Sequence, residues 1–219
     1  MRRIITGLLY LAAFASPIRA EIVSLDALAL GQPPAWFVPA LTGKGGPPNW
    51  VVEKAPGNEV GHVLIQRSAE ATDYRYPLLI YDRITASDLA VSVKFRAVAG
   101  KVDQAAGLVW RYRDANNYYV VRANALENNV VLYKVETGVR IDLPVKGKGR
   151  SYGASAPILK SQWNALGVEA AGKLFTVTLN GRTLYQVEDG TFAAAGKVGL
   201  WTKADSVMMF RDFTIGERK

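Results

Sequence analysis

The chain has 219 residues, of which 49% are apolar and 21% charged, an ordinary globular composition that suits one domain or at most two. It contains no cysteine, which excludes disulfide bonds and thiol chemistry. The formal charge is +8, but the basic residues are dispersed along the chain. Nucleic-acid binding predicts a concentrated basic face instead, so we expect no nucleic-acid partner.

The first twenty residues, MRRIITGLLYLAAFASPIRA, follow the order of a secretory signal peptide. Two arginines precede an apolar run from Ile4 to Phe14, and cleavage after Ala15 or Ala20 would suit the small residues that follow. The run is too short to span a bilayer, and no later stretch reaches the ~20 apolar residues required. We therefore expect residues 1–20 to be removed, and a mature protein without a membrane span in the periplasm or outside the cell. A retained N-terminal anchor is the alternative.

Residues 21–49 are expected to form a lead-in that packs on the domain after it. The stretch from Gly31 to Asn49 alone holds five of the ten prolines and four glycines. Such a composition disfavours regular internal structure and favours an extended path. Residues 50–219 are expected to form a single domain.

From Trp50 onward, short segments rich in β-branched and aromatic residues alternate in polarity, with turn residues about every ten positions. Asn180-Gly181 gives the strongest hairpin signal, because a tight primed turn needs positive φ. The pattern predicts an all-β fold of two antiparallel sheets packed face to face, a sandwich. The expected strands are WVVEK, HVLIQR, LLIYD, LAVSVKFRA, GLVWRYR, YYVVRAN, VVLYKVE, VRIDL, WNALGVEA, LFTVTLN, TLYQVED, KVGLWTK and VMMFRDFTI.

The stretch AAGLVWRYRDANNYYVVR, residues 105–122, determines which side chains we expect in solvent. Successive strand residues point to opposite faces, and arginine is seldom buried unless it is paired. Alternation predicts four aromatic side chains that point mostly inward: Trp110, Tyr112, Tyr119 and Tyr133. It predicts one exposed face, shared by three adjacent strands, that carries Arg111, Arg113, Tyr118, Arg122, Asn124 and Lys134.

Two tryptophans outside this stretch bear on a binding surface. In GLWTK, residues 199–203, alternation sets Leu200 against Trp201 and Lys203. If Leu200 faces the core, Trp201 faces outward, where its ring could stack on a sugar; a buried Trp201 is the alternative. Trp163 begins an expected strand, and we expect it in the core.

Four stretches carry a resemblance to a known family: AAGLVWRYRDANNYYVVRAN, NNVVLYKVETGVRIDL, WNALGVEAAGKLFTVTLNGRTLYQVED and AGKVGLWTKADSVMMFRDFTI. Together they resemble the concanavalin A-like lectin and glucanase superfamily. The resemblance is nearest to the laminin-G-like and 3-keto-disaccharide hydrolase (DUF1080-type) domains of secreted bacterial proteins. It implies a jelly-roll sandwich with a concave face that in relatives often meets carbohydrate. Some relatives bind calcium, so an oxygen-liganded calcium site is possible here, and no other cofactor is expected.

Catalytic motifs are not evident. Sugar hydrolysis normally needs two carboxylates across the scissile bond, and the Glu-x-Asp-x-x-Glu spacing of sandwich-fold glucanases is absent. A pair could still converge from different strands, with Asp82, Asp114 and Glu127 as nominal candidates. His62, the single histidine, opens an expected strand without a visible partner. We therefore expect neither a Ser-His-Asp device nor a histidine metal site.

Three functions follow from these observations. The first is a non-catalytic carbohydrate-binding module that holds a glycan through Arg111, Arg113, Tyr118, Arg122, Asn124, Trp201 and Lys203. The planar donor fork of arginine would favour acidic or hydroxyl-rich glycans. The second is a glycoside hydrolase, as the nearest named family implies. The third is a structural envelope protein that binds another protein through a sheet edge.

Overall fold

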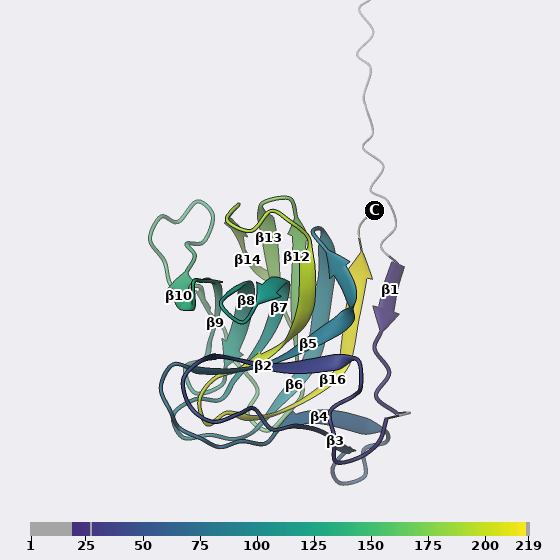
Figure 1. The fold of residues 1–219 in the computed structure, drawn as a ribbon. Coiled ribbons are helices and arrows are strands. Elements are labelled where there is room, and N and C mark those ends of the chain that lie inside the picture. Colours follow the sequence, from purple (N-terminus) through teal and green to yellow (C-terminus); the bar gives the residue numbers. More distant parts are fainter. Residues whose placement is uncertain (1–18, 27, 218–219) are drawn as a thin grey trace, which may run out of the picture.

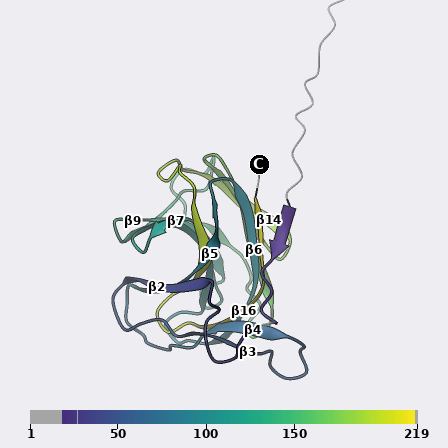
Figure 2. The same cartoon turned by 45° about the vertical axis from the view of Figure 1, so that its right-hand side comes forward.

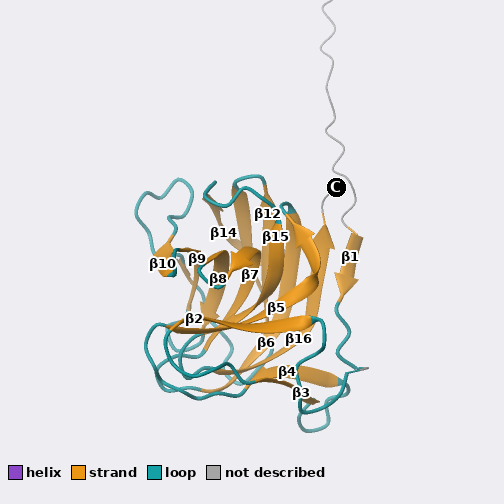
Figure 3. Cartoon of the chain, in the orientation of Figure 1, coloured by secondary structure: helices purple, strands orange, loops and turns teal. Residues whose placement is uncertain are grey.

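The computed structural model describes residues 19–26 and 28–217, and these form only strands, turns and loops (Figures 1 and 3). The strands make two antiparallel sheets that pack face to face, so the predicted all-β sandwich is confirmed. None of the described residues belongs to a helix that could cross a membrane. The predicted signal peptide, apart from its last two residues, lies outside the described part of the chain.

Each sheet has eight strands, and strands that neighbour one another in the following orders are hydrogen-bonded. Sheet A has the order β14 (Arg182–Glu188), β13 (Leu174–Leu179), β12 (Asn164–Ala171), β6 (Leu89–Ala99), β16 (Val207–Glu217), β4 (His62–Gln66) and β3 (Trp50–Lys54), and β1 (Arg19–Ile22) pairs with β16. Sheet B has the order β10 (Val139–Asp142), β9 (Asn129–Glu136), β8 (Asn117–Asn124), β7 (Ala105–Asp114), β15 (Gly196–Thr202), β5 (Arg75–Ala86) and β2 (Phe37–Gly43), and β11 (Ala154–Ser155) pairs with β9.

Two segments show how the sequence produces this order. Asn180 and Gly181 both have positive φ and connect β13 to β14, as the hairpin prediction requires. Strand β2 lies within the proline-rich segment expected as a lead-in, and it forms an edge of sheet B against β5. An edge tolerates Pro39, because the missing N–H there removes no bond from the middle of the sheet.

The main core lies between the sheets and takes alternate side chains from both. Trp110 of β7 stacks on Tyr119 of β8, with ring centroids 5.5 Å apart, and Phe175 of sheet A meets both rings. All three side chains are fully buried. The inward placement predicted for Trp110 and Tyr119 is therefore correct.

Sheet B curls so strongly that its outer face is also buried. Thr42 of β2 and Tyr118 of β8 share a hydrogen bond of 2.8 Å, although three strands separate them in the sheet. Flat neighbouring strands lie ~4.8 Å apart, so this contact requires the sheet to fold over its own face. In Figures 1 and 2, β2 accordingly runs across the sandwich at a steep angle to β6 and β16. We call this hollowed, outward side the concave face of sheet B.

The concave face holds a second apolar cluster, separate from the main core. Its centre is a stacked pair, Tyr76 and Trp201, with ring centroids 5.4 Å apart. The other members include Leu78, Ile80, Val109, Tyr118, Val120, Val131, Tyr133 and Val135. Sheet B is therefore buried on both sides, and alternation of polarity cannot distinguish its faces.

Candidate functional site

The structure places the seven predicted binding residues in three environments. Five of them are almost completely buried: Arg111, Tyr118, Arg122, Asn124 and Trp201. Lys203 is half-buried and Arg113 is exposed. The prediction that the arginines share one solvent-facing surface is therefore wrong.

A β-bulge in β7 explains why Arg111 and Arg122 lie apart. Arg111 has a φ of 47°, and the register of β7 against β8 shifts between Trp110 and Asp114. A bulge adds one residue and reverses the alternation after it. Tyr112 consequently packs on Tyr118 at the concave face, which corrects its predicted inward placement.

Arg111 lies on the opposite side of sheet B from Arg122 and joins three loops. Its guanidinium donates to the carbonyl oxygens of Ser87 at 2.9 Å, Phe192 at 2.8 Å and Gly172 at 2.5 Å. Arg113 extends over the Phe192 ring at 5.0 Å. These contacts give Arg111 a structural role.

Tyr133 and Lys134 of β9 also lie on the faces of sheet B opposite to those predicted for them. Tyr133 belongs to the concave cluster, whereas Lys134 follows the core side and reaches Thr191 Oγ1 at 2.9 Å. A lysine can bury its methylene chain and bring its ammonium group to the rim. The charge of Lys134 therefore led to the wrong prediction of which face of β9 is exposed to solvent.

Trp201 lies opposite Leu200, as alternation predicted, but the curl of sheet B covers it. Arg140 of β10 spans the hollow, with its guanidinium carbon 4.5 Å from the Tyr133 ring, 4.9 Å from Tyr76 and 6.0 Å from Trp201. The Nη1 atom of Arg140 is buried and has no hydrogen-bond partner within the described part of the chain. The Arg140 guanidinium thus covers the aromatic rings of Tyr76, Tyr133 and Trp201 on the concave face.

A polar cluster, which we call the Arg122 network, lies at the end of the concave face where β8 ends and β9 begins. Its centre is the Asn124 amide, whose Nδ2 donates to Asp103 Oδ1 at 2.8 Å and to Glu127 Oε1 at 3.0 Å. Lys203 Nζ lies 2.7 Å from the other oxygen of Asp103. Arg122 donates to Glu127 Oε2 at 2.8 Å. Two carboxylates, of Asp103 and Glu127, and two cationic groups, of Arg122 and Lys203, therefore lie around the buried Asn124 amide.

The network reaches solvent through Tyr152, whose residue is 50% exposed. Its hydroxyl accepts a hydrogen bond from Arg122 Nη2 at 3.1 Å and shares another with the Tyr133 hydroxyl at 2.6 Å. The Glu127 side chain is 41% exposed. The accessible part of the network therefore combines an aromatic ring, a carboxylate and the ammonium group of Lys203.

The charged state of the network follows from its contacts. Burial alone would raise the pKa of Glu127, but Arg122 and the hydrogen bonds from Arg122 and Asn129 outweigh it and lower that pKa. Burial would likewise lower the pKa of Arg122, yet Tyr133 and Glu127 beside it raise it. Both groups are therefore ionised at neutral pH.

The structure thus brings together Arg122, Asn124 and Lys203 of the predicted set, with Tyr118 and Trp201 nearby on the same face. Asp103, Arg140 and Tyr152 were missed, and Glu127 was considered only as a nominal acid. The spacing Arg122-x-Asn124-x-x-Glu127 could have revealed part of the network, because strand residues two apart share a face. Tyr152 comes from a loop far along the chain and left no such signal.

Within residues 19–26 and 28–217, no three His, Cys, Asp or Glu side chains gather to hold a metal ion. His62 sits at the start of β4, where its ring Nδ1 lies 3.1 Å from the Leu25 carbonyl oxygen. Calcium binding stays a prediction, which thermal unfolding with added calcium or a chelator would test.

Comparison with models of known protein families gives no match. Comparison with curated protein sequences gives none either. Solved structures, in contrast, match most of the chain. The carbohydrate-binding module CBM66 from Bacillus subtilis has a TM-score of 0.60 at 22% identity, over 78% of this chain and 92% of that one.

The fold is that of a two-sheet antiparallel β-sandwich, which the CBM66 module shares. Two further sandwiches support it. Domain 4 of AbnA, a GH43 extracellular arabinanase from Geobacillus stearothermophilus solved with arabinotriose, has a TM-score of 0.52 at 15% identity, over 91% of this chain and 93% of that one. A protein of unknown function with a galectin-like fold from Bacillus subtilis has a TM-score of 0.54 at 9% identity, over 91% and 100%. At these identities the likeness concerns the fold.

Proposed function

We propose that this protein is an exported carbohydrate-binding module that holds a glycan at the accessible side of the Arg122 network. The observation that carries the proposal is a chain of contacts beside the exposed ring of Tyr152: Arg122 binds Glu127, the Asn124 amide joins Glu127 to Asp103, and Asp103 binds Lys203. Sugars offer apolar ring faces and pairs of hydroxyl groups. An aromatic ring with fixed donors and acceptors matches both.

Other observations support the same reading. Two of the similar sandwiches are associated with carbohydrate, namely the CBM66 module and the arabinanase domain solved with arabinotriose. The pattern of residues 1–20 supports export, which would bring the protein to extracellular or periplasmic glycans. We also propose that the 3-keto-disaccharide hydrolase domains, which the sequence resembles most, are relatives of this protein.

A glycan array with the protein lacking residues 1–20 tests the proposal, with titration of each hit by calorimetry. Tyr152→Ala and Glu127→Gln should weaken binding at least about tenfold, because they remove an exposed ring and an accepting charge. Ile22→Ala is the control, since Ile22 is also exposed but lies on β1 of sheet A. Buried Arg111 and Trp201 are unsuitable, because their loss would disturb the fold.

Binding that survives both network variants would contradict the proposed site. An array without hits would contradict glycan binding itself and favour the structural envelope protein.

One observation favours glycoside hydrolysis as a second candidate. Asp103 and Glu127 both accept from Asn124 Nδ2, so their nearest oxygens lie no more than about 6 Å apart, close to the spacing of retaining enzymes. A general acid needs a raised pKa, however, and that of Glu127 is lowered. Asp103 is buried and paired with Lys203. Binding therefore ranks first.

Release of reducing ends from the best array ligand would test the hydrolase directly. Turnover that disappears in Glu127→Gln while binding persists would reverse the ranking.

A further inference from the structure

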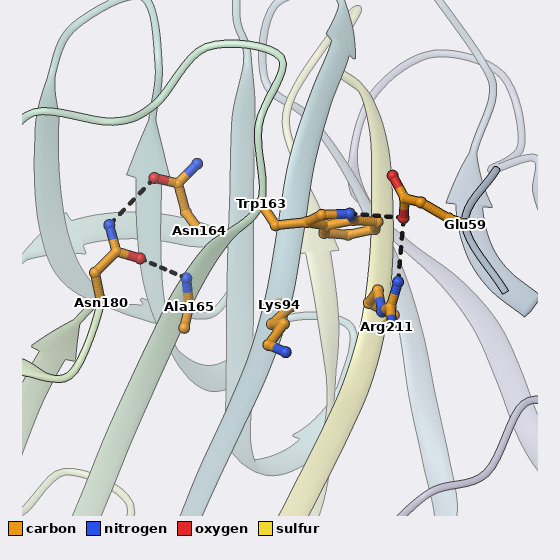
Figure 4. Close-up of a pocket in the computed structure, with 7 residues that line it drawn as sticks. All are labelled: Glu59, Lys94, Trp163, Asn164, Ala165, Asn180 and Arg211. Carbon is orange, nitrogen blue, oxygen red and sulfur yellow. Dashed lines mark hydrogen bonds and ion pairs between the residues drawn. The ribbon is translucent and has the colours of Figure 1, made fainter. Parts of the chain in front are cut away.

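A cavity of about 390 Å³ opens on the outer face of sheet A, the side turned away from the main core. It lies above β6 and β16, beside the start of β12, and is lined by Glu59, Lys94, Trp163, Asn164, Ala165, Asn180 and Arg211 (Figure 4). We call it the Trp163 cavity. Trp163 was expected in the core, but it is only half-buried and borders this space.

The indole of Trp163 is held in one orientation. Its Nε1 donates to Glu59 Oε2 at 2.9 Å, and Glu59 also accepts from Arg96 at 2.7 Å and from Arg211 at 3.1 Å. The two guanidinium carbons lie 4.6 and 5.3 Å from the centre of the Trp163 ring. A ring fixed in this way loses little conformational freedom when a ligand stacks on it.

The amide side chains on the opposite wall are rigid as well. Asn180 accepts from the Ala165 N–H at 2.7 Å and donates to Asn164 Oδ1 at 3.3 Å (Figure 4). Asn164 also donates to the Leu159 carbonyl oxygen at 2.9 Å. These amides therefore set the shape of the wall, and the recognition of a ligand falls to the charged groups.

Cations outnumber acids around the Trp163 cavity. Glu59 is shared by three donors, and the pKa of its carboxyl is lowered first by the hydrogen bond from Trp163 and also by Arg96 and Arg211. The Lys94 ammonium, 2.8 Å from Asp212 Oδ2, has three N–H donors and uses one there. Arg211 binds Glu59 through Nη1 and has its Nε 3.6 Å from Asp212 Oδ1, and its Nη2 makes no hydrogen bond or ion pair among the described residues.

We infer that the Trp163 cavity is a second saccharide-binding site, specific for a sugar unit that carries a carboxylate, such as a uronic acid. The apolar face of the sugar ring would stack on Trp163, and its carboxylate would meet Lys94 and Arg211. The volume is within the range of ligand pockets, and charge-assisted bonds to carboxylates are stronger than neutral ones. The site shares no residue with the Arg122 network, so either proposal can fail without the other.

Titration with trigalacturonic acid and with its methyl ester, as a matched neutral probe, tests the inference by calorimetry. The acid should bind at least about tenfold more tightly than the ester, and added salt should weaken it. Lys94→Met and Trp163→Ala should each reduce affinity for the acid by a similar factor. Lys173→Met, on an exposed turn of the same sheet, should leave affinity unchanged.

Circular dichroism and thermal unfolding would establish that each variant is folded, and Trp163→Leu, which fills space without an aromatic ring, replaces Trp163→Ala if that variant unfolds. Equal affinity for acid and ester would overturn the carboxylate specificity. Absence of binding, or binding that survives both Lys94→Met and the folded Trp163 variant, would overturn the site.

Discussion

Buried arginine side chains hold the loops of this sandwich at both ends. Arg75 donates to the carbonyl oxygens of Gly46, Pro47 and Ala204, and Arg111 serves three other carbonyls at the opposite end. Such a group is tolerated inside because its donors are paired. Sequence alternation could not identify them, because it treats arginine as a marker of the surface.

Replacement of Arg111 should therefore affect folding more than binding. In Arg111→Met, three carbonyl oxygens lose their donor, and we expect the free energy of unfolding to fall by about 3 kcal/mol. Urea denaturation followed by circular dichroism measures this. Arg113→Met, two residues along the same strand, should change it by less than about 1 kcal/mol. Similar losses for both would contradict the structural role of Arg111.

Asp205 makes stability depend on pH. Burial would raise its pKa, but hydrogen bonds from the N–H groups of Lys101, Val102 and Asp103 outweigh it and lower the pKa. A folded pKa below the unfolded value of about 3.9 adds stability above that value, and the gain disappears as pH falls through the folded pKa. The melting temperature should drop between about pH 5 and pH 2.

Asp205→Asn should reduce the fall of the melting temperature between about pH 5 and pH 2, because an amide does not titrate in that range. The same slope in wild type and variant would assign the acid sensitivity to other carboxylates.

At the scale of elements, the sequence predicted the strands but not the bulge that sets their faces. The run Gly107 to Arg113 alternates as a regular strand, and nothing in its composition marks Arg111 for positive φ. The bulge depends on a contact with a strand far along the chain. A Cβ at Gly196 of β15 would lie 2.6 Å from Arg111 Cα. Only a glycine opposite the bulge leaves room for it, and pairing of β15 with β7 cannot be read from either strand alone.

The short strand β11 controls where Tyr152 lies. Gly153 just before it has a φ of 57°, and a Cβ there would lie 2.1 Å from the Val130 carbonyl oxygen. Gly153→Ala should therefore displace β11 from β9 and weaken glycan binding at the Arg122 network about tenfold or more. Gly147→Ala, at a similar φ with open space around it, is the control for strain alone.

Calorimetric titration with the best array ligand measures both variants. Unchanged binding in folded Gly153→Ala would show that the position of Tyr152 does not matter for the ligand.

At the scale of the whole molecule, the two proposed sites lie on opposite faces. The Arg122 network is on the concave face of sheet B, the Trp163 cavity is on the outer face of sheet A, and the main core separates them. One molecule could therefore hold two polysaccharide chains, or two parts of one chain, at once. Two linked weak sites gain avidity through effective concentration.

Mixing the protein with a long polysaccharide that carries ligands for both sites should produce turbidity. Glu127→Gln and Lys94→Met should each abolish turbidity while leaving binding at the other site. Turbidity that persists in both single variants would contradict bridging by two faces.

Composition and pattern together predicted the class of fold, the hairpin at Asn180 and the inward Trp110. They did not predict the site, because the curl of sheet B buries both of its faces. Alternation of polar and apolar residues identifies the faces of a sheet only when one of them is exposed to solvent. The Trp163 cavity was missed for a related reason: a tryptophan at the start of a strand resembles a core residue unless the acid that binds its N–H, Glu59, is known.

The pairing of β1 with β16 brings the two ends of the described chain to one sheet edge, with Arg19 opposite Glu217 (Figure 1). Strand β6 runs from Leu89, which also faces Glu217, to Ala99, just before the loop that leads to Asp103. Attachment of the protein to a bead, a sensor chip or a fusion partner through either end of the described chain would therefore anchor it by the pole opposite Asp103, with the pole that carries the proposed glycan site turned toward the bulk solution.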